Sequence, residues 1–278
     1  MSKDLLLKDL ANEVRNQYKI VAAKVNGQLK ELTSYVNSKD KIEFIDLTDM
    51  DGIRIYQRGL SYLLIRATKE IYPELELKIS HSLSKGLFFE VYSNKVFTKK
   101  HVNEIKKKMK EIVKKDENFL KIKVSRENAK KLFNQMNMET KTDLLDYRKY
   151  GYINLYKNGD MQKYFFGYMV PSTGYLDIFD LLFYDGGIIL RHPTINTPNS
   201  IPEFIESPNI AQIFSEYTKW AGIHNCNYVS NLNNIIKNND QKDLILLAEA
   251  LHARKIIEIA DKINKKNKRV ILIAGPSS

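Results

Sequence analysis

The sequence predicts an α+β protein in which antiparallel strands pack against helices. Segments that alternate apolar and polar residues, as half-buried strands do, recur between turns rich in Gly, Pro and Asn. Segments with apolar residues three and four positions apart, as amphipathic helices have, lie between and after them. The 278 residues are 43% hydrophobic and 28% charged, so the chain is long and apolar enough for more than one hydrophobic core.

The N-terminal segment, residues 1–47, predicts a small β-grasp-like unit. The first residues have the pattern of a short helix. They do not have the pattern of a signal peptide, because acidic side chains interrupt the apolar run that a signal peptide needs. Residues 20–32 form two strand patterns around Asn26 and Gly27, a pair that favours a tight hairpin because both residues accept a positive φ. The alternation over 41–47 adds a further strand.

A second domain is predicted over 48–195. It begins with a buried helix at 59–73, which Pro73 ends. Strands are expected on both sides of Lys85 and Gly86, and more strands in the aromatic and β-branched segment 150–193. Two basic helices are expected between these strand regions. One begins after Thr98, a plausible N-cap, and the other begins after Ser125.

The last part of the chain predicts a helical linker region over 196–268. Prolines and asparagines open it, and helical spacing follows over 209–223 and 241–264. Residues 269–278 then have the pattern of a final β-strand, Val270 to Ala274, that stops at Gly275. A parallel strand needs neighbouring strands and covering helices, so we expect these residues to be an exposed apolar tail.

Positive charge is concentrated in one stretch. The chain carries a net charge of +11, and residues 99–131 alone contain 13 Lys and Arg against 5 Asp and Glu. Clustered cations are typical of nucleic-acid binding because they replace the counterions of phosphates. They are also typical of a solvated helix face, the interpretation we favour here because few aromatic residues lie among these lysines to stack on bases.

The single cysteine, Cys226, excludes an internal disulfide and favours a cytoplasmic protein in which this residue only packs. No apolar run approaches the roughly 20 residues that span a bilayer, so no membrane partner is expected. The sequence does not indicate the oligomeric state.

Several segments of the middle region resemble a known family when taken in order. They are GLSYLLIRATKEIYP, the basic segment that begins KGLFFEVYS, SRENAKKLF and YMVPSTGYL. Together they resemble the second additional domain of threonyl- and alanyl-tRNA synthetases, which edits mischarged tRNA in those enzymes. The preceding segment resembles the TGS domain of threonyl-tRNA synthetase. In that family a strand precedes the first helix, whereas here the helix pattern begins almost at Met1, so we expect part of the β-grasp fold to be missing.

The resemblance implies where editing chemistry should lie. The family uses two histidines four residues apart on its first helix, then a cysteine and a histidine four residues apart before VPSTG. The corresponding residues here are Arg58, Tyr62, Phe165 and Met169. None of the four is a good metal ligand or general base, so the sequence predicts that the scaffold is kept, that the hydrolytic residues are lost, and that no metal binds and no catalytic residue is present.

A remnant of the editing cleft could still bind tRNA or another anionic ligand. The alternative is that the substitutions simply fill it, and we weigh that alternative slightly ahead. The candidate residues of this remnant cleft are Arg58, Tyr62, His81, Ser82, Ser84, Lys85, Tyr168, Met169, Ser172 and Thr173.

The domain order and the last residues also resemble a second group, the long bacterial nucleoside kinases of the phosphoribulokinase/uridine kinase family. In that group a strand leads into a phosphate-binding loop, so Gly275, Pro276, Ser277 and Ser278 would begin an ATP-binding Walker A loop. The resemblance implies a parent uridine-type kinase that uses ATP, Mg²⁺ and a nucleoside. The 278-residue chain itself would be an inactive accessory portion without a cofactor, because the loop lysine and the kinase core are missing.

Two other functions stay open beside the kinase. One is a tRNA- or RNA-binding module derived from threonyl-tRNA synthetase, which fits both the basic stretch and the synthetase resemblance. The other is an aminoacyl-tRNA editing hydrolase, which fits the scaffold but not the four substituted positions.

Overall fold

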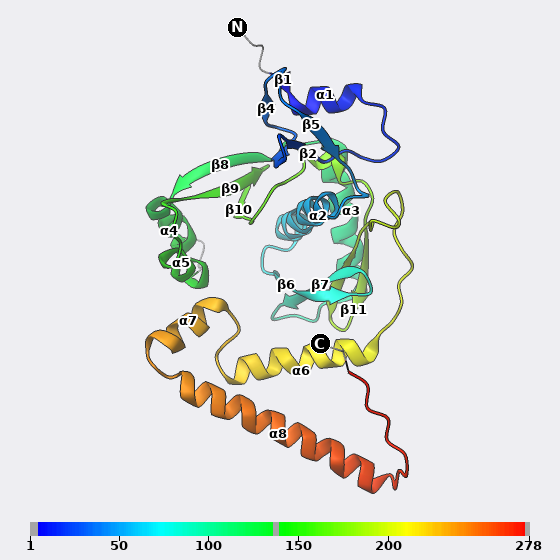
Figure 1. Ribbon diagram of the computed structural model, residues 1–278, viewed down its shortest axis with the longest axis vertical. Helices are drawn as coiled ribbons and strands as arrows, with labels where there is room; N and C mark the ends of the chain where they lie inside the picture. The colour runs from blue at the N-terminus through cyan, green and yellow to red at the C-terminus, as the bar shows by residue number, and fades with distance from the viewer. Residues whose placement is uncertain (1–4, 136–138, 276–278) are drawn as a thin grey trace. The chain divides into compact units, whose positions relative to one another are not determined.

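The structure is a computed structural model that describes residues 5–135 and 139–275 (Figure 1). It confirms the α+β class, with antiparallel sheets packed on helices. The chain forms two compact units. One contains the described residues up to Ala129 together with Tyr150–Phe214, and the other contains Lys130–Lys149 and the residues from Ser215 onward. The division into four segments that the sequence suggests stays a prediction.

The N-terminal part of the first unit is a small sheet with one helix. A two-residue strand, β1 (Leu5–Leu6), does precede helix α1 (Leu7–Glu13), and it pairs with β4 (Tyr35–Val36). Strands β2 (Ala22–Val25), β3 (Gln28–Glu31) and β5 (Ile42–Ile45) form an antiparallel sheet in the order β3-β2-β5. The predicted hairpin is confirmed, since Asn26 and Gly27 both have a positive φ, 51° and 81°.

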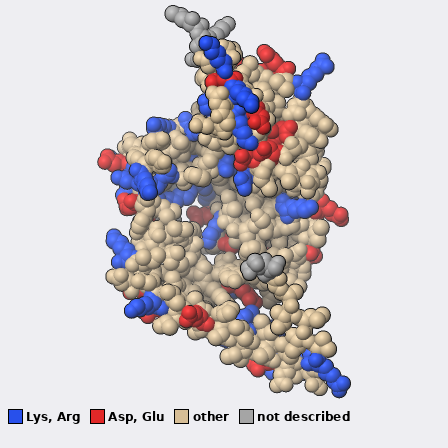
Figure 2. All heavy atoms as spheres, in the orientation of Figure 1, with Lys and Arg blue, Asp and Glu red and all other residues tan. Residues whose placement is uncertain are grey.

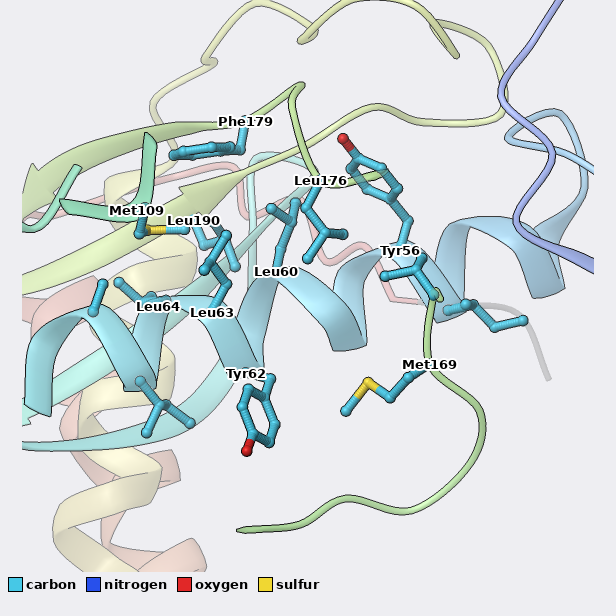
Figure 3. Close-up of a cluster of buried hydrophobic side chains, with 14 of the residues drawn as sticks. Tyr56, Leu60, Tyr62, Leu63, Leu64, Met109, Met169, Leu176, Phe179 and Leu190 are labelled. Atoms are coloured by element: carbon cyan, nitrogen blue, oxygen red, sulfur yellow. The ribbon is translucent and has the colours of Figure 1, made fainter. Parts of the chain in front are cut away.

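Helix α2 (Met50–Ile71) is the central element of the first unit. It begins earlier than predicted, at an N-cap where the Asp49 side chain accepts the N–H of Asp51 at 2.7 Å. Residues around its whole circumference are buried from Ile55 to Thr68, apart from the half-buried Gln57 and Arg58. Figure 3 shows apolar side chains such as Leu60 and Leu63 above the helix, and Tyr62 on the opposite side.

A four-stranded antiparallel sheet lies on one side of this core. Its order is β11-β12-β7-β6, and helix α3 (Lys99–Lys115) packs on α2 and on β11. Thr98 caps α3 as predicted, in a reciprocal capping box with His101. The strands are β6 (Glu76–Leu83), β7 (Gly86–Tyr92), β11 (Asp180–Tyr184) and β12 (Gly187–Arg191).

Part of the aromatic segment forms a separate three-stranded antiparallel sheet. Its order is β10-β9-β8, with β8 (Leu120–Ser125), β9 (Tyr152–Asn158) and β10 (Met161–Tyr164). In this sheet Lys121 lies opposite Tyr156, and Tyr156 lies opposite Lys163. Residues directly opposite one another share a face, so one face of the sheet carries lysines and tyrosines from three strands.

Buried Arg66 of α2 joins this sheet to the core. Its guanidinium donates to Glu70 at 2.7 Å, to Glu117 at 2.5 Å and to the side chain of Asn158. Gly159, with φ of 57°, turns the β9–β10 hairpin directly over this guanidinium, where a Cβ atom would lie 2.6 Å from the Nη2 atom of Arg66. A buried charge needs such partners, because an unpaired one is costly to remove from water.

The remaining helices contribute little to the buried core. Helices α6 (Pro208–Ile223) and α8 (Gln241–Lys265) bury none of their residues. The other helices are α4 (Arg126–Gln135), α5 (Glu139–Asp146), α7 (Val229–Lys237) and the single 3₁₀ turn η1 (Thr173–Tyr175). Within residues 5–135 and 139–275, no helix combines the length and apolar character that crossing a membrane requires.

The final strand pattern forms no strand and is an exposed apolar segment, as expected for a strand without neighbours. Residues 270–274 have no strand assignment, and Leu272 and Ile273 are more than 90% exposed. An isolated strand has no partners for its backbone groups, so five apolar residues are insufficient without a neighbouring strand. Gly275 is also exposed, and Pro276, Ser277 and Ser278 lie outside the described residues.

The first prediction concerns the hairpin over Arg66. Gly159→Ala should lower the free energy of unfolding by about 2–3 kcal/mol, because it adds a steric clash to the strain of a positive φ. Gly186→Ala is the matched control: Gly186 also has a positive φ, 73°, but no atom lies within 4 Å of its added Cβ. It should cost only about 1 kcal/mol. Equal losses in chemical denaturation would contradict this role of Gly159.

Candidate functional site

The four residues predicted to stand at the editing-ligand positions lie close together beside α2. Arg58 and Tyr62 lie one turn apart on the helix, and the rings of Tyr62 and Phe165 are 5.4 Å apart between centroids. Arg58 donates from Nη1 to the backbone oxygen of Tyr168 at 2.6 Å. Met169 is buried beside them, and Figure 3 shows it on the same side of α2 as Tyr62.

Tyr62 is a structural residue in this arrangement. Its hydroxyl lies 2.6 Å from the backbone oxygen of Met161 and 3.0 Å from that of Tyr156, and its ring packs edge-on against Phe119. Burial raises the pKa of this hydroxyl, so it stays protonated at neutral pH and cannot act as a general base. Tyr62 therefore belongs to a packed aromatic cluster with Phe119 and Phe165.

The side chain of Glu31 also lies next to Met169 and Tyr156. No sequence pattern identified this residue. It is the last residue of β3, and its side chain is only 7% exposed. Oε1 accepts the backbone N–H of Met169 at 3.0 Å and the hydroxyl of Tyr156, while Oε2 lies 3.1 Å from Nζ of Lys121. Burial and the Glu31 charge raise the pKa of the Tyr156 hydroxyl, so the tyrosine remains a donor.

The other predicted cleft residues from strand β6 and its turn have different neighbours. The ring of His81 stacks on Phe214 at 4.0 Å between centroids, and burial lowers its pKa. The hydroxyl of Ser84 accepts the N–H of Ile205 at 2.7 Å. Ser82 and Lys85 are exposed on the same hairpin. Arg58 instead makes its hydrogen bond with the segment after β10. No described contact therefore joins the predicted cleft residues of the β6–β7 hairpin to those around Arg58.

Ser172 and Thr173 are buried next to the end of α3. The Thr173 hydroxyl donates to the oxygen of Ile112 at 2.9 Å and accepts the N–H of Glu117 at 2.9 Å. The Ser172 hydroxyl is buried without a hydrogen-bond partner among the described residues. Thr173 therefore ties the VPSTG segment to the helix end.

An exposed surface of mixed aromatic and basic character lies beside the filled cleft. The Nζ atom of Lys123 is 3.8 Å from the ring centroid of Tyr152, and that of Lys121 is 4.9 Å from the centroid of Tyr168. Phe166 is 80% exposed and precedes Gly167, whose oxygen accepts the Tyr156 hydroxyl at 2.8 Å. We define the aromatic–basic surface as Lys121, Lys123, Tyr150, Tyr152, Phe166 and Tyr168; Figure 2 shows Lys and Arg atoms gathered over β8 and β9 in this region.

This surface could not be found by scanning the basic stretch for aromatic neighbours. Lys121 and Lys123 are on β8, whereas the aromatic residues come from the segment 150–168, and only the pairing of β8 with β9 brings the two together. Tyr150 is 66% exposed, and its ring lies 6.3 Å from that of Tyr152. Few aromatic residues are neighbours of these lysines in the sequence, as noted above. In the folded sheet, however, tyrosine rings do lie next to Lys121 and Lys123.

The part of the chain that the structure describes contains no group of three or more His, Cys, Asp and Glu side chains placed to hold a metal ion. Arg58 keeps its charge at neutral pH even though burial lowers the pKa of its guanidinium. The cations and aromatic rings of the site suit the binding of anions and bases. The buried carboxylate of Glu31 is already held by Lys121, Tyr156 and Met169.

Comparison with known proteins identifies a consistent set of relatives. The chain is 29% identical over 180 residues to a threonine–tRNA ligase of Wolbachia, an alignment that covers 64% of this chain and 28% of that protein. It is 32% identical over 157 residues to a threonine–tRNA ligase of Clostridium kluyveri, which covers 56% and 25%. A threonine–tRNA ligase of Clostridium novyi is 29% identical over 176 residues, with 62% and 28% covered. No protein-family model matches the chain.

These relatives correct the kinase interpretation. The chain spans about a quarter of the length of the curated relatives that it matches, and they are tRNA ligases rather than nucleoside kinases. The nucleoside-kinase parent, its ATP, Mg²⁺ and nucleoside, and the Walker A assignment of Gly275 are therefore wrong. The error has a physical cause: a short apolar run before a glycine is common, and the Gly-Lys pair that defines a phosphate loop is not part of this sequence.

The second prediction follows from the residues at the editing positions. The purified protein should carry no stoichiometric zinc and should not release serine from Ser-tRNA, because Arg58, Tyr62, Phe165 and Met169 provide neither a ligand set nor a base. Elemental analysis and a deacylation assay test this directly. One tightly held zinc ion per chain, or serine release above the uncatalysed rate, would show that the editing positions are misassigned.

Proposed function

We propose that this chain is a tRNA-binding module, related to part of threonine–tRNA ligases, that binds RNA without hydrolysing an aminoacyl ester. The observation that carries the proposal is the aromatic–basic surface, in which Lys121 and Lys123 lie over the rings of tyrosines that come from a different part of the chain.

The chemistry of this surface matches unpaired RNA. Exposed aromatic rings stack on bases of any sequence, and each such stack contributes about 1–3 kcal/mol. Lysines next to the rings contact the phosphates between the stacked bases and release their counterions. Tyr150, Tyr152 and Phe166 are the most exposed rings, and Lys123 is the lysine that lies nearest to one of them.

The relatives supply the choice of RNA. Their names associate them with tRNA and threonine, and the similarity extends over more than half of this chain. Because the chain spans only about a quarter of their length, we do not extend the ligase activity to it. Of the predicted cleft residues, we assign Arg58 and Tyr168 to the inner edge of the RNA surface, since the guanidinium of Arg58 holds the backbone of Tyr168.

The editing-hydrolase alternative has less support, because Tyr62 and the other three residues at the predicted editing positions cannot activate water. The carboxylate of Glu31 beside them is held by Lys121, Tyr156 and Met169. A cytoplasmic location, which the single cysteine predicts, fits the binding of tRNA and is part of this proposal.

The third prediction tests the surface. Phe166→Ala should weaken the binding of a threonine tRNA transcript about 5- to 150-fold, which corresponds to about 1–3 kcal/mol for one lost stack. Lys123→Ala should also weaken binding and should make the slope of log K against log salt shallower by about 0.7 to 0.9, as expected for one lost phosphate contact. Fluorescence anisotropy at several salt concentrations measures both effects.

Lys110→Ala is the matched control. It removes one charge from the exposed face of α3, which belongs to the same basic stretch but not to the aromatic–basic surface. The affinity of this variant for the threonine tRNA transcript should stay within about twofold of that of the wild type. If Lys110→Ala weakens binding as much as Lys123→Ala while Phe166→Ala has no effect, the RNA contact is a general effect of charge and the proposed surface is wrong.

A further inference from the structure

The carboxylate of Glu31 is an unusual neighbour for an RNA-binding surface. It belongs to the N-terminal sheet, more than 80 residues before the surface in the chain, yet it makes its hydrogen bonds with Lys121, Tyr156 and Met169. Its side chain is 7% exposed, whereas that of Lys121 is 32% exposed. The carboxylate therefore lies beneath the surface, and the lysine connects it to solvent.

The donors around Glu31 form a built site for an anion. A backbone N–H, a tyrosine hydroxyl and an ammonium group converge on one carboxylate, and the positive charge of Arg58 also acts on Tyr156 at the same place. Groups of these kinds are the ones that hold a phosphate or a carboxylate from a ligand. Here a side chain of the same protein takes the ligand's place.

We propose that Glu31 is an internal counter-anion that occupies an anion subsite of the aromatic–basic surface and competes with RNA phosphate for Lys121. This inference rests on the proposed function, because it states how the affinity of that surface for RNA is set.

The competition follows from the geometry of Lys121. Its ammonium group lies 3.1 Å from Oε2 of Glu31 and 4.9 Å from the ring centroid of Tyr168, so the same charge serves the carboxylate and the surface. A phosphate that approaches Tyr168 must share the lysine with Glu31 or displace the carboxylate. Either way, the negative charge of Glu31 opposes the phosphate, and the surface binds RNA more weakly than its lysines alone would allow.

Glu31→Gln is the decisive variant, because it keeps the size of the side chain and removes its charge, while one of the two acceptor oxygens becomes an NH2 donor. It should tighten the binding of the threonine tRNA transcript about fivefold at 0.1 M salt and steepen the salt slope by about 0.7, as expected for one additional phosphate contact. Glu43→Gln is the control, since Glu43 is an exposed carboxylate on the same N-terminal sheet and should change the affinity by less than about twofold.

A double-mutant cycle separates this specific competition from a general change in charge. In a Lys121→Ala background, Glu31→Gln should no longer tighten RNA binding, because the group for which the two anions compete is gone. Unchanged or weaker RNA binding by Glu31→Gln, or the same gain with and without Lys121, would overturn the proposal.

A second measurement tests the anion subsite without RNA. Glu31→Ala should be stabilised by sodium acetate relative to sodium chloride at equal ionic strength, with a rise in Tm that the wild type does not show, because acetate can occupy the vacated position. Folding of the variant only in acetate would also support the subsite. No difference between the salts, or no folding in either, would overturn it. If the wild type fails to bind tRNA while acetate stabilises the variant, the proposed function fails but the anion subsite stands.

Discussion

The burial of helix α2 on nearly every side is the constraint on which the rest of the first unit depends. A helix with this environment can carry polar side chains only where each one finds a partner. Tyr62 satisfies its hydroxyl on the backbone of Met161, and Arg66 is held by Glu70 and Glu117. Tyr62, which stands at one of the predicted editing positions, is in this protein part of the packing between the helix and the β8–β10 sheet.

The same constraint explains why binding is expected beside the old cleft. Once aromatic rings fill the space next to Tyr62, the remaining charged groups lie at its edge, where Arg58 holds the segment after β10. Strand β8 then brings Lys121 and Lys123 under tyrosines of that segment and of β9. Glu31 connects this edge to the N-terminal sheet from beneath, through its contacts with Lys121, Tyr156 and Met169.

Local patterns in the sequence were sufficient for most of the elements and insufficient for the site. Asn26 and Gly27 predict their hairpin because positive φ is a local property, and Thr98 predicts the start of α3 for a similar reason. The aromatic–basic surface depends on strand pairing between distant segments, which no local pattern shows. Glu31 was also not predictable, because an acidic residue at the end of an alternating strand is expected to be exposed, and the residues that bury it, Lys121, Tyr156 and Met169, lie about 90 or more positions later in the chain. The kinase interpretation is wrong because the relatives are threonine–tRNA ligases, and an apolar run before a glycine is too common a pattern to define a phosphate loop.

The central claim is that RNA contacts the aromatic–basic surface rather than the basic face of α3. Ultraviolet crosslinking of the bound threonine tRNA transcript, followed by mass spectrometry of the peptides, tests it most directly because crosslinks form between bases and the aromatic rings stacked on them. The account predicts crosslinks at Tyr150, Tyr152, Phe166 or Tyr168. Crosslinks confined to the residues of α3, with none in the segment 150–168, would contradict it.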